Sequence, residues 1–185
     1  MPTLRALAAS LALSACSAIV PSTAARLGAF DPLTADPAAI ELVVLLPPGL
    51  AVIPGSAQLE LSAERGSEHL AGSFLLSDQP VSGAIALPPG ATARRFALAD
   101  PDVGRMRDLQ GQIAGWKRQG PAKGSLGLGM GACAIGQGPG PDARGTVLIR
   151  LEEDGPLLPL VADASLADLL GPEVFSAIKP CKGGE

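Results

Sequence analysis

Few residues in this chain have the types and spacing that catalysis or metal binding requires. The sequence contains a single histidine, His69, which lies in a strand-like pattern without a linked set of catalytic or metal-binding partners. The acidic run at residues 152–154 lacks the spacing of a calcium-binding loop and is typical of a solvated turn. Motifs of serine hydrolases, zinc proteases, paired-cysteine oxidoreductases and nucleotide-binding loops are absent from the sequence. We therefore expect no catalytic residue, no metal site and no cofactor.

The segment GSLGLGMGACAIGQGPG at residues 124–140 is the strongest candidate for a specialised loop. Phosphate-binding loops place their glycines between a strand and a helix, whereas here glycines recur at every second position and no helical pattern follows. Period two predicts a strand with one apolar face and one bare face, and a bulge near Gly131. Something flat could lie against the bare face, and Trp116 is the candidate if the predicted helix crosses there. The alternating residues are Gly127, Gly129 and Gly131 on one face and Leu126, Leu128 and Met130 on the other.

The amino terminus has the layout of a secretory signal. One positive charge at Arg5 precedes an uncharged, mainly apolar run over residues 6–15, which is too short to span a bilayer as a helix. The run ends in Leu13-Ser14-Ala15-Cys16, which resembles the lipobox of bacterial lipoproteins: Leu, a small residue, Ala or Gly, and then Cys. This resemblance extends over residues 1–16 only. It implies that residues 1–15 are removed as a signal peptide and that Cys16 becomes the lipidated first residue.

The same resemblance implies a location. In this family three acyl chains on the cysteine anchor the protein firmly, so the membrane itself becomes a partner. An Asp after the cysteine commonly retains such proteins at the inner membrane, whereas Ser17 stands here, which implies the periplasmic face of the outer membrane. The alternative is an ordinary secretory signal cut near Ala18 or Ala24, which would leave a soluble periplasmic protein.

Removal of the signal would leave two cysteines besides the anchor, Cys133 and Cys181. In an oxidising periplasm two cysteines most simply form a disulfide, which would also fix the C-terminal tail. A thiol redox pair is the alternative, but reactive pairs usually lie close together as Cys-x-x-Cys.

The chain is long enough for one domain with a sizeable core. It has 185 residues, of which 47% are hydrophobic, and its 23 glycines and 18 prolines favour many turns and short elements. We expect residues 16–36 to form a lipidated N-terminus and flexible tether, and residues 37–185 to form a single globular β-rich domain.

Period-two patterns and turn signals predict a mainly β fold, an antiparallel β-sandwich or half-barrel of about seven short strands. The strand over 40–46 is apolar on both faces and is typical of a central strand, whereas Pro159 indicates an edge. The predicted strands cover residues 40–46, 57–63, 70–76, 94–98, the glycine-rich segment, 146–152 and 157–161.

One amphipathic helix is predicted at about residues 101–119. Asp100 is its expected N-cap and Pro101 its first helical residue. A capping pattern at Ser165 predicts a short C-terminal helix. The apolar stripe of the long helix consists of Val103, Met106, Leu109, Ile113 and Trp116.

The tetrapeptide Leu-Pro-Pro-Gly occurs twice, at residues 46–49 and 87–90. It indicates either an internal duplication or common turn chemistry, and four residues are too few to favour duplication.

Basic side chains outnumber acidic ones over residues 94–123, although the whole chain has a net charge of −4 and no general attraction to nucleic acid. Such a face is suited to lipopolysaccharide phosphates, peptidoglycan carboxylates or an acidic envelope protein. The alternative is a solvated face whose charges pair with acidic neighbours. The candidate interaction face consists of Arg94, Arg95, Arg105, Arg107, Lys117 and Arg118.

Together these patterns favour a lipid-anchored envelope protein with a non-catalytic binding or structural domain. The alternative is a small lipid-anchored hydrolase, or a carrier of a hydrophobic ligand, with an unrecognised site. A deep apolar cavity would favour a carrier, and a flat basic face would favour an interaction module.

Overall fold

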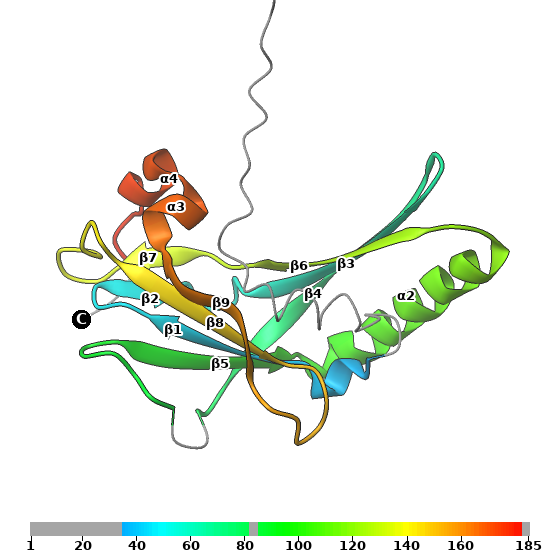
Figure 1. Cartoon of the computed structure of the whole chain (residues 1–185), viewed down its shortest axis with the longest axis horizontal. Coiled ribbons are helices and arrows are strands. Elements are labelled where there is room, and N and C mark those ends of the chain that lie inside the picture. Colours follow the sequence, from blue (N-terminus) through cyan, green and yellow to red (C-terminus); the bar gives the residue numbers. More distant parts are fainter. Residues whose placement is uncertain (1–34, 82–84, 183–185) are drawn as a thin grey trace, which may run out of the picture.

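The computed structural model describes residues 35–81 and 85–182. Within them, a seven-stranded antiparallel half-barrel sheet is combined with a two-stranded sheet and a few helices, which confirms the mainly β fold (Figure 1). The strands are β1 (Glu41–Leu46), β2 (Leu50–Val52), β3 (Gln58–Arg65), β4 (Glu68–Gln79), β5 (Thr92–Leu98), β6 (Lys123–Gly129), β7 (Ala132–Ala134), β8 (Arg144–Arg150) and β9 (Leu158–Ser165). The helices are η1 (Pro37–Ala39), α2 (Asp100–Gln119), α3 (Leu166–Leu170) and α4 (Pro172–Ser176).

The large sheet has the strand order β6-β3-β4-β5-β1-β8-β9, and every pairing in it is antiparallel. Strand β1 lies between β5 and β8, and all but one of its six residues are buried, which confirms the expected central strand. Strand β9 is an edge strand, as Pro159 predicts. Strands β2 and β7 pair separately beside this sheet.

The core lies on the face of the sheet that packs against α2, which we call the inner face. Alternate residues of β3 point to it, as the period-two pattern predicts, and Leu59 and Leu61 are almost fully buried there. Phe74 of β4 and Phe96 of β5 join the same cluster. Figure 1 shows α2 at one end of the sheet and α3 and α4 at the other.

Helix α2 packs closely on β4 because Gly72 lacks a side chain. Met106, Leu109 and Ile113 are buried, which confirms the predicted apolar stripe. A Cβ at Gly72 would lie 2.9 Å from Cδ2 of Leu109 and 2.7 Å from Cζ of Phe74. The helix therefore crosses the strand at a position that only glycine fits without rearrangement.

The start of α2 differs from the expectation. Asp100 is the first helical residue rather than the N-cap, and the cap residue, Ala99, makes no side-chain capping bond. Asp102 is buried instead and accepts a hydrogen bond from the backbone N–H of Leu75 (2.6 Å) and another from Arg105. This carboxylate ties the first turn of the helix to strand β4.

The glycine-rich segment forms β6, an edge strand, and not a phosphate loop. Gly127 lies opposite Glu60 on the outer face of the sheet. Trp116 packs against the core cluster, with the guanidinium of Arg65 4.7 Å from its ring centroid. The expectation that Trp116 covers the glycine face is therefore wrong, because the helix lies against the opposite, apolar face.

Ordered contacts begin before the expected domain boundary. The backbone carbonyl of Ala35 accepts a hydrogen bond from Gln110 (3.0 Å), and Asp36 pairs with Arg107 (2.6 Å), whose hydrogen bond holds the pKa of Asp36 below its ordinary value. Most of the predicted tether, and the lipobox, lie outside the described residues. Among residues 35–81 and 85–182, no helix is both long and apolar enough to cross a lipid bilayer.

We predict that Gly72→Ala destabilises the domain by about 1–3 kcal/mol, because the added methyl group would collide with Phe74 and Leu109. The measurement is urea unfolding followed by circular dichroism. Gly111→Ala is the matched control, since a Cβ there meets no atom within 4 Å. It should stabilise the helix by up to about 1 kcal/mol. Equal effects of the two substitutions would contradict the close approach.

Candidate functional site

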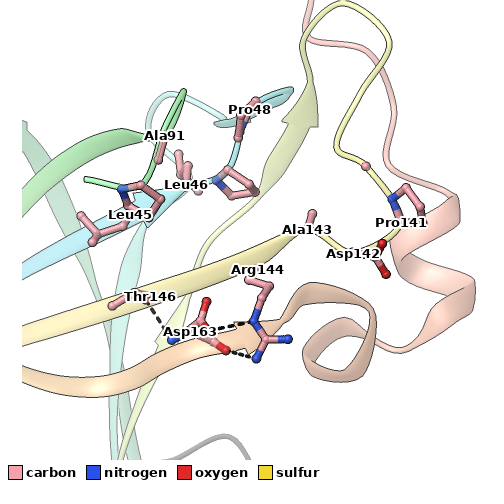
Figure 2. Close-up of a pocket in the computed structure, with 13 residues that line it drawn as sticks. Leu45, Leu46, Pro48, Ala91, Pro141, Asp142, Ala143, Arg144, Thr146 and Asp163 are labelled. Atoms are coloured by element: carbon pink, nitrogen blue, oxygen red, sulfur yellow. Dashed lines mark hydrogen bonds and ion pairs between the residues drawn. The ribbon is translucent and has the colours of Figure 1, made fainter. Parts of the chain in front are cut away.

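A pocket of about 440 Å³ opens at the end of the sheet where β1 finishes and β8 begins. Figure 2 shows Leu45, Leu46, Pro48 and Ala91 on one side of it and Pro141, Ala143 and Arg144 on the other. Its walls are mainly apolar and its rim is polar. The lining residues are Leu45, Leu46, Pro47, Pro48, Pro88, Ala91, Gly140, Pro141, Asp142, Ala143, Arg144, Thr146 and Asp163.

The two Leu-Pro-Pro-Gly segments build one wall of this pocket. Because β1 and β5 are antiparallel neighbours, the segment after β1 and the segment before β5 meet at the same end of the sheet. Gly49 and Gly90 have φ angles of 82° and 73°, and each follows a proline, as in a type II turn. A Cβ on Gly90 would lie 2.9 Å from Cγ of Pro48, so the two turns pack against each other. The prolines make this wall rigid.

The opposite wall is held by polar contacts between β8 and β9. Nε of Arg144 lies 3.0 Å from Oδ2 of Asp163, and a second guanidinium nitrogen donates to the Asp163 backbone carbonyl. The N–H of Asp163 donates to Oγ1 of Thr146 (3.0 Å) (Figure 2). Asp163 has a φ of 42°, and the β8–β9 register shifts beside it. The pocket thus has apolar walls and an oriented ion pair, an arrangement suited to holding a ligand.

The structure disperses the predicted basic face. Arg94 and Arg95 are successive residues of β5, so their side chains point to opposite faces of the sheet. Lys117 and Arg118 lie in the last turn of α2. Four of the six basic side chains form ion pairs, which favours the alternative interpretation of a solvated face whose charges pair with acidic neighbours. The role of this set as an interaction face stays a prediction. The ion pairs are Arg94–Asp78, Arg95–Glu41, Arg105–Asp102 and Arg107–Asp36.

One charged cluster was missed at the sequence level. Glu41 is buried, and the same oxygen, Oε2, lies within bonding distance of Arg95 (2.6 Å) and Arg150 (3.2 Å). The available signal was a glutamate inside an otherwise apolar central strand. Its partners stand 54 and 109 residues away in the sequence, so no local pattern connects them.

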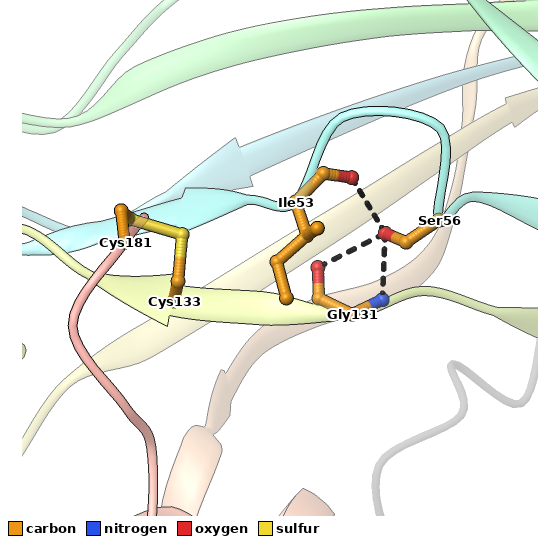
Figure 3. Close-up of a disulfide and its surroundings, with 5 residues drawn as sticks. All are labelled: Ile53, Ser56, Gly131, Cys133 and Cys181. Carbon is orange, nitrogen blue, oxygen red and sulfur yellow. Dashed lines mark hydrogen bonds between the residues drawn. A yellow bond between two sulfur atoms is a disulfide. The ribbon is translucent and has the colours of Figure 1, made fainter. Parts of the chain in front are cut away.

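The disulfide between Cys133 and Cys181 is confirmed (Figure 3). The Cα atoms lie 4.8 Å apart. Two backbone hydrogen bonds beside the disulfide hold the C-terminal tail against β7. The N–H of Ala134 donates to the carbonyl of Lys179 (2.9 Å), and the N–H of Cys181 donates to the carbonyl of Ala134 (3.0 Å). The disulfide therefore links the segment that follows α4 to the two-stranded sheet of β2 and β7.

The expected bulge near Gly131 is instead the point where the chain leaves β3 and begins to pair with β2. Ser56 stabilises this crossing, because its hydroxyl accepts from the N–H of Gly131 (2.9 Å) and donates to the carbonyl of Ile53 (2.7 Å) (Figure 3). A Cβ on Gly131 would lie 3.1 Å from Cδ1 of Ile53, so the crossing favours glycine. The change of partner places Cys133 on β7, within reach of Cys181.

The remaining chemical candidates are solvated. His69 is exposed and lies opposite Glu64, and residues 152–154 form an exposed turn. Within the described part of the chain, no group of three or more His, Cys, Asp or Glu residues is placed to hold a metal ion. Comparisons with protein-family models, with curated proteins and with solved structures found no match to this chain.

We predict that replacing both cysteines, Cys133→Ala with Cys181→Ala, lowers the free energy of unfolding by up to about 4 kcal/mol, because the bond closes a loop with a separation of 48 residues. Urea unfolding of the variant and of the parent protein, with and without reductant, measures this. Only the parent should respond to reductant. Free thiols at both positions in a non-reducing digest of the parent would contradict the bond.

Proposed function

We propose that this chain is a lipid-anchored protein of the bacterial cell envelope, held through Cys16 at the periplasmic face of the outer membrane. The observation that carries the proposal is the Cys133–Cys181 disulfide. Structural disulfides persist in oxidising compartments, of which the periplasm is one. The sequence has three cysteines, so this pairing leaves Cys16, the cysteine of the lipobox-like motif, as the remaining thiol.

We further propose that the β-rich domain binds another envelope component, either a protein, lipopolysaccharide or peptidoglycan, without catalysing a reaction on it. The pocket supports this role, because its rigid apolar wall is preformed and costs little ordering on binding. Its polar groups, Arg144 and Asp163, engage each other, which suits orientation of a ligand more than proton transfer.

A second candidate function, carriage of a small hydrophobic ligand, is favoured by the size of the pocket. Its volume of about 440 Å³ lies within the range of about 300–1,000 Å³ that is usual for small-molecule sites. Leu45, Leu46 and Ala143 supply apolar surface, while the exposed Pro48 and Pro141 lie at a mouth through which a ligand would enter.

We predict that Cys16→Ala moves the protein from the membrane fraction to the soluble fraction, because acyl chains contribute about 0.8 kcal/mol per buried methylene. The measurement is fractionation of cells followed by immunoblotting. Cys133→Ala with Cys181→Ala is the control and should stay with the membrane. If the Cys16→Ala protein stays in the membrane fraction to the same extent as the parent, the anchoring proposal is contradicted.

Filling the pocket separates the two binding roles. We predict that Ala91→Trp abolishes binding in the pocket, because Ala91 lines the pocket wall and a tryptophan there would fill it. Ala71→Trp, on the exposed part of β4, is the control and should leave binding unchanged. Mass spectrometry of small molecules extracted from purified protein reports a carried ligand, and crosslinking in intact cells reports an envelope partner. Signals that are identical in the two variants would exclude the pocket from both roles.

A further inference from the structure

Three charged side chains meet on the outer face of the sheet, opposite the core. Glu41 opens the central strand β1, and Arg95 and Arg150 come from its neighbours β5 and β8. In the ladders, Arg150 lies directly opposite Glu41, and Arg95 lies opposite Val43, two positions along the same face. Antiparallel pairing thus brings both arginines to one glutamate, and we call these three residues the Arg95–Glu41–Arg150 cluster.

The cluster has more positive than negative charge in a largely enclosed place. Oε2 of Glu41 lies 2.6 Å from a terminal nitrogen of Arg95 and 3.2 Å from one of Arg150. The side chain of Glu41 is 10% exposed, and those of Arg95 and Arg150 are 26% and 29% exposed. Since one carboxylate faces two guanidinium groups, the three side chains together have a net charge of +1. Electrostatic interactions are stronger here than at a fully solvated surface.

Within the described residues, Arg150 has one hydrogen-bond acceptor, Oε2 of Glu41. Its Nε is buried without an acceptor, whereas the side chain as a whole is 29% exposed. A ligand oxygen would therefore meet the terminal nitrogens of Arg150 and balance its charge. Gln79 lies opposite Arg95 on the same face, with its amide donating to Ser77 (3.1 Å), and adds polar groups beside the cluster.

A purely structural role would need less charge. One arginine is enough to neutralise Glu41, and Arg95 already makes the shorter of the two bonds. That bond raises the pKa of Arg95 above its ordinary value, so Arg95 stays charged throughout the physiological range. The second guanidinium is therefore available to an added anion. Arginine presents a planar fork of donors that matches phosphate oxygens, and a tetrahedral phosphate accepts from two such groups at once.

We propose that the Arg95–Glu41–Arg150 cluster is a binding site for a phosphate group, held by Arg150, with Arg95 adding positive charge and Glu41 setting the orientation of both arginines. The phosphate belongs either to a lipid headgroup or to a soluble phosphate ester, which present the same chemistry. The site is separate from the pocket and does not depend on the lipid anchor.

The test is a titration of the full-length Cys16→Ala protein with inorganic phosphate, followed through the Nε–H resonances of arginine in ¹H–¹⁵N spectra. The Arg150 resonance should shift with saturation. Arg150→Gln should weaken binding about tenfold or more, because it removes a charge-assisted hydrogen bond. Arg65→Gln is the matched control: it removes the same charge from another ion pair with a carboxylate, at a similarly exposed arginine, and should leave the affinity unchanged.

Glu41→Gln separates a ligand site from a structural cluster. It removes the competing carboxylate, so a phosphate site should bind at least threefold more tightly, even where thermal stability falls. A structural cluster would lose stability and gain no affinity. Arg150→Lys keeps the charge and provides a folded variant in case Arg150→Gln does not fold; it should bind more weakly than the parent, because it lacks the planar fork.

A second arm identifies the source of the phosphate. Flotation of the same Cys16→Ala protein with vesicles of phosphatidylglycerol, lost in Arg150→Gln, would assign a lipid headgroup. Binding of inorganic phosphate without binding to vesicles would assign a soluble phosphate ester. No titratable shift of the Arg150 resonance, or equal affinity in the parent, Arg150→Gln and Glu41→Gln proteins, would overturn the proposal.

Discussion

The close contact between α2 and β4 at Gly72 is the interaction on which the rest of this fold depends. A sheet whose strands alternate apolar and polar residues must cover its apolar face, and α2 does so over β3 and β4. The missing side chain at Gly72 leaves room for Leu109 of α2 and Phe74 of β4 to approach each other. Asp102 holds the start of the helix on β4, because its carboxylate accepts a hydrogen bond from the N–H of Leu75. Without this contact the most buried side chains of β3 and β4 would face water.

At the other end of the sheet, covalent and local constraints replace the helix. The chain leaves the large sheet at Gly131, pairs with β2, and is fastened to the C-terminal tail by Cys133 and Cys181. The two short helices α3 and α4 lie between β9 and this staple along the chain. Rigid Pro-Gly turns and the Arg144–Asp163 pair then shape the pocket, so its form follows from backbone restraints more than from a deep core.

Strand β1 links the features that bear on function. Its first residue, Glu41, holds the Arg95–Glu41–Arg150 cluster, and its last residues, Leu45 and Leu46, line the pocket. Leu45 lies four positions along the strand from Glu41, a rise of about 13 Å. Five other arginines of the described segments are paired with carboxylates: Arg65, Arg94, Arg105, Arg107 and Arg144. The net charge of the chain therefore says little about where a ligand would bind. The excess of positive over negative charge in the Arg95–Glu41–Arg150 cluster is the better guide to where an anion would bind.

Local patterns determined much of this structure. Period two specified which residues share a face, the apolar stripe specified α2, and Pro159 specified an edge, because each depends on neighbours in the chain. The sequence alone also limited the disulfide to Cys133 and Cys181, once Cys16 is assigned to the anchor. Only the tertiary structure decided which strands are neighbours, and therefore that Arg150 meets Glu41, that Asp102 is buried and that the bare glycine face is left outside. Periodicity says which side chains lie together on a face, whereas packing between distant segments decides which face is covered.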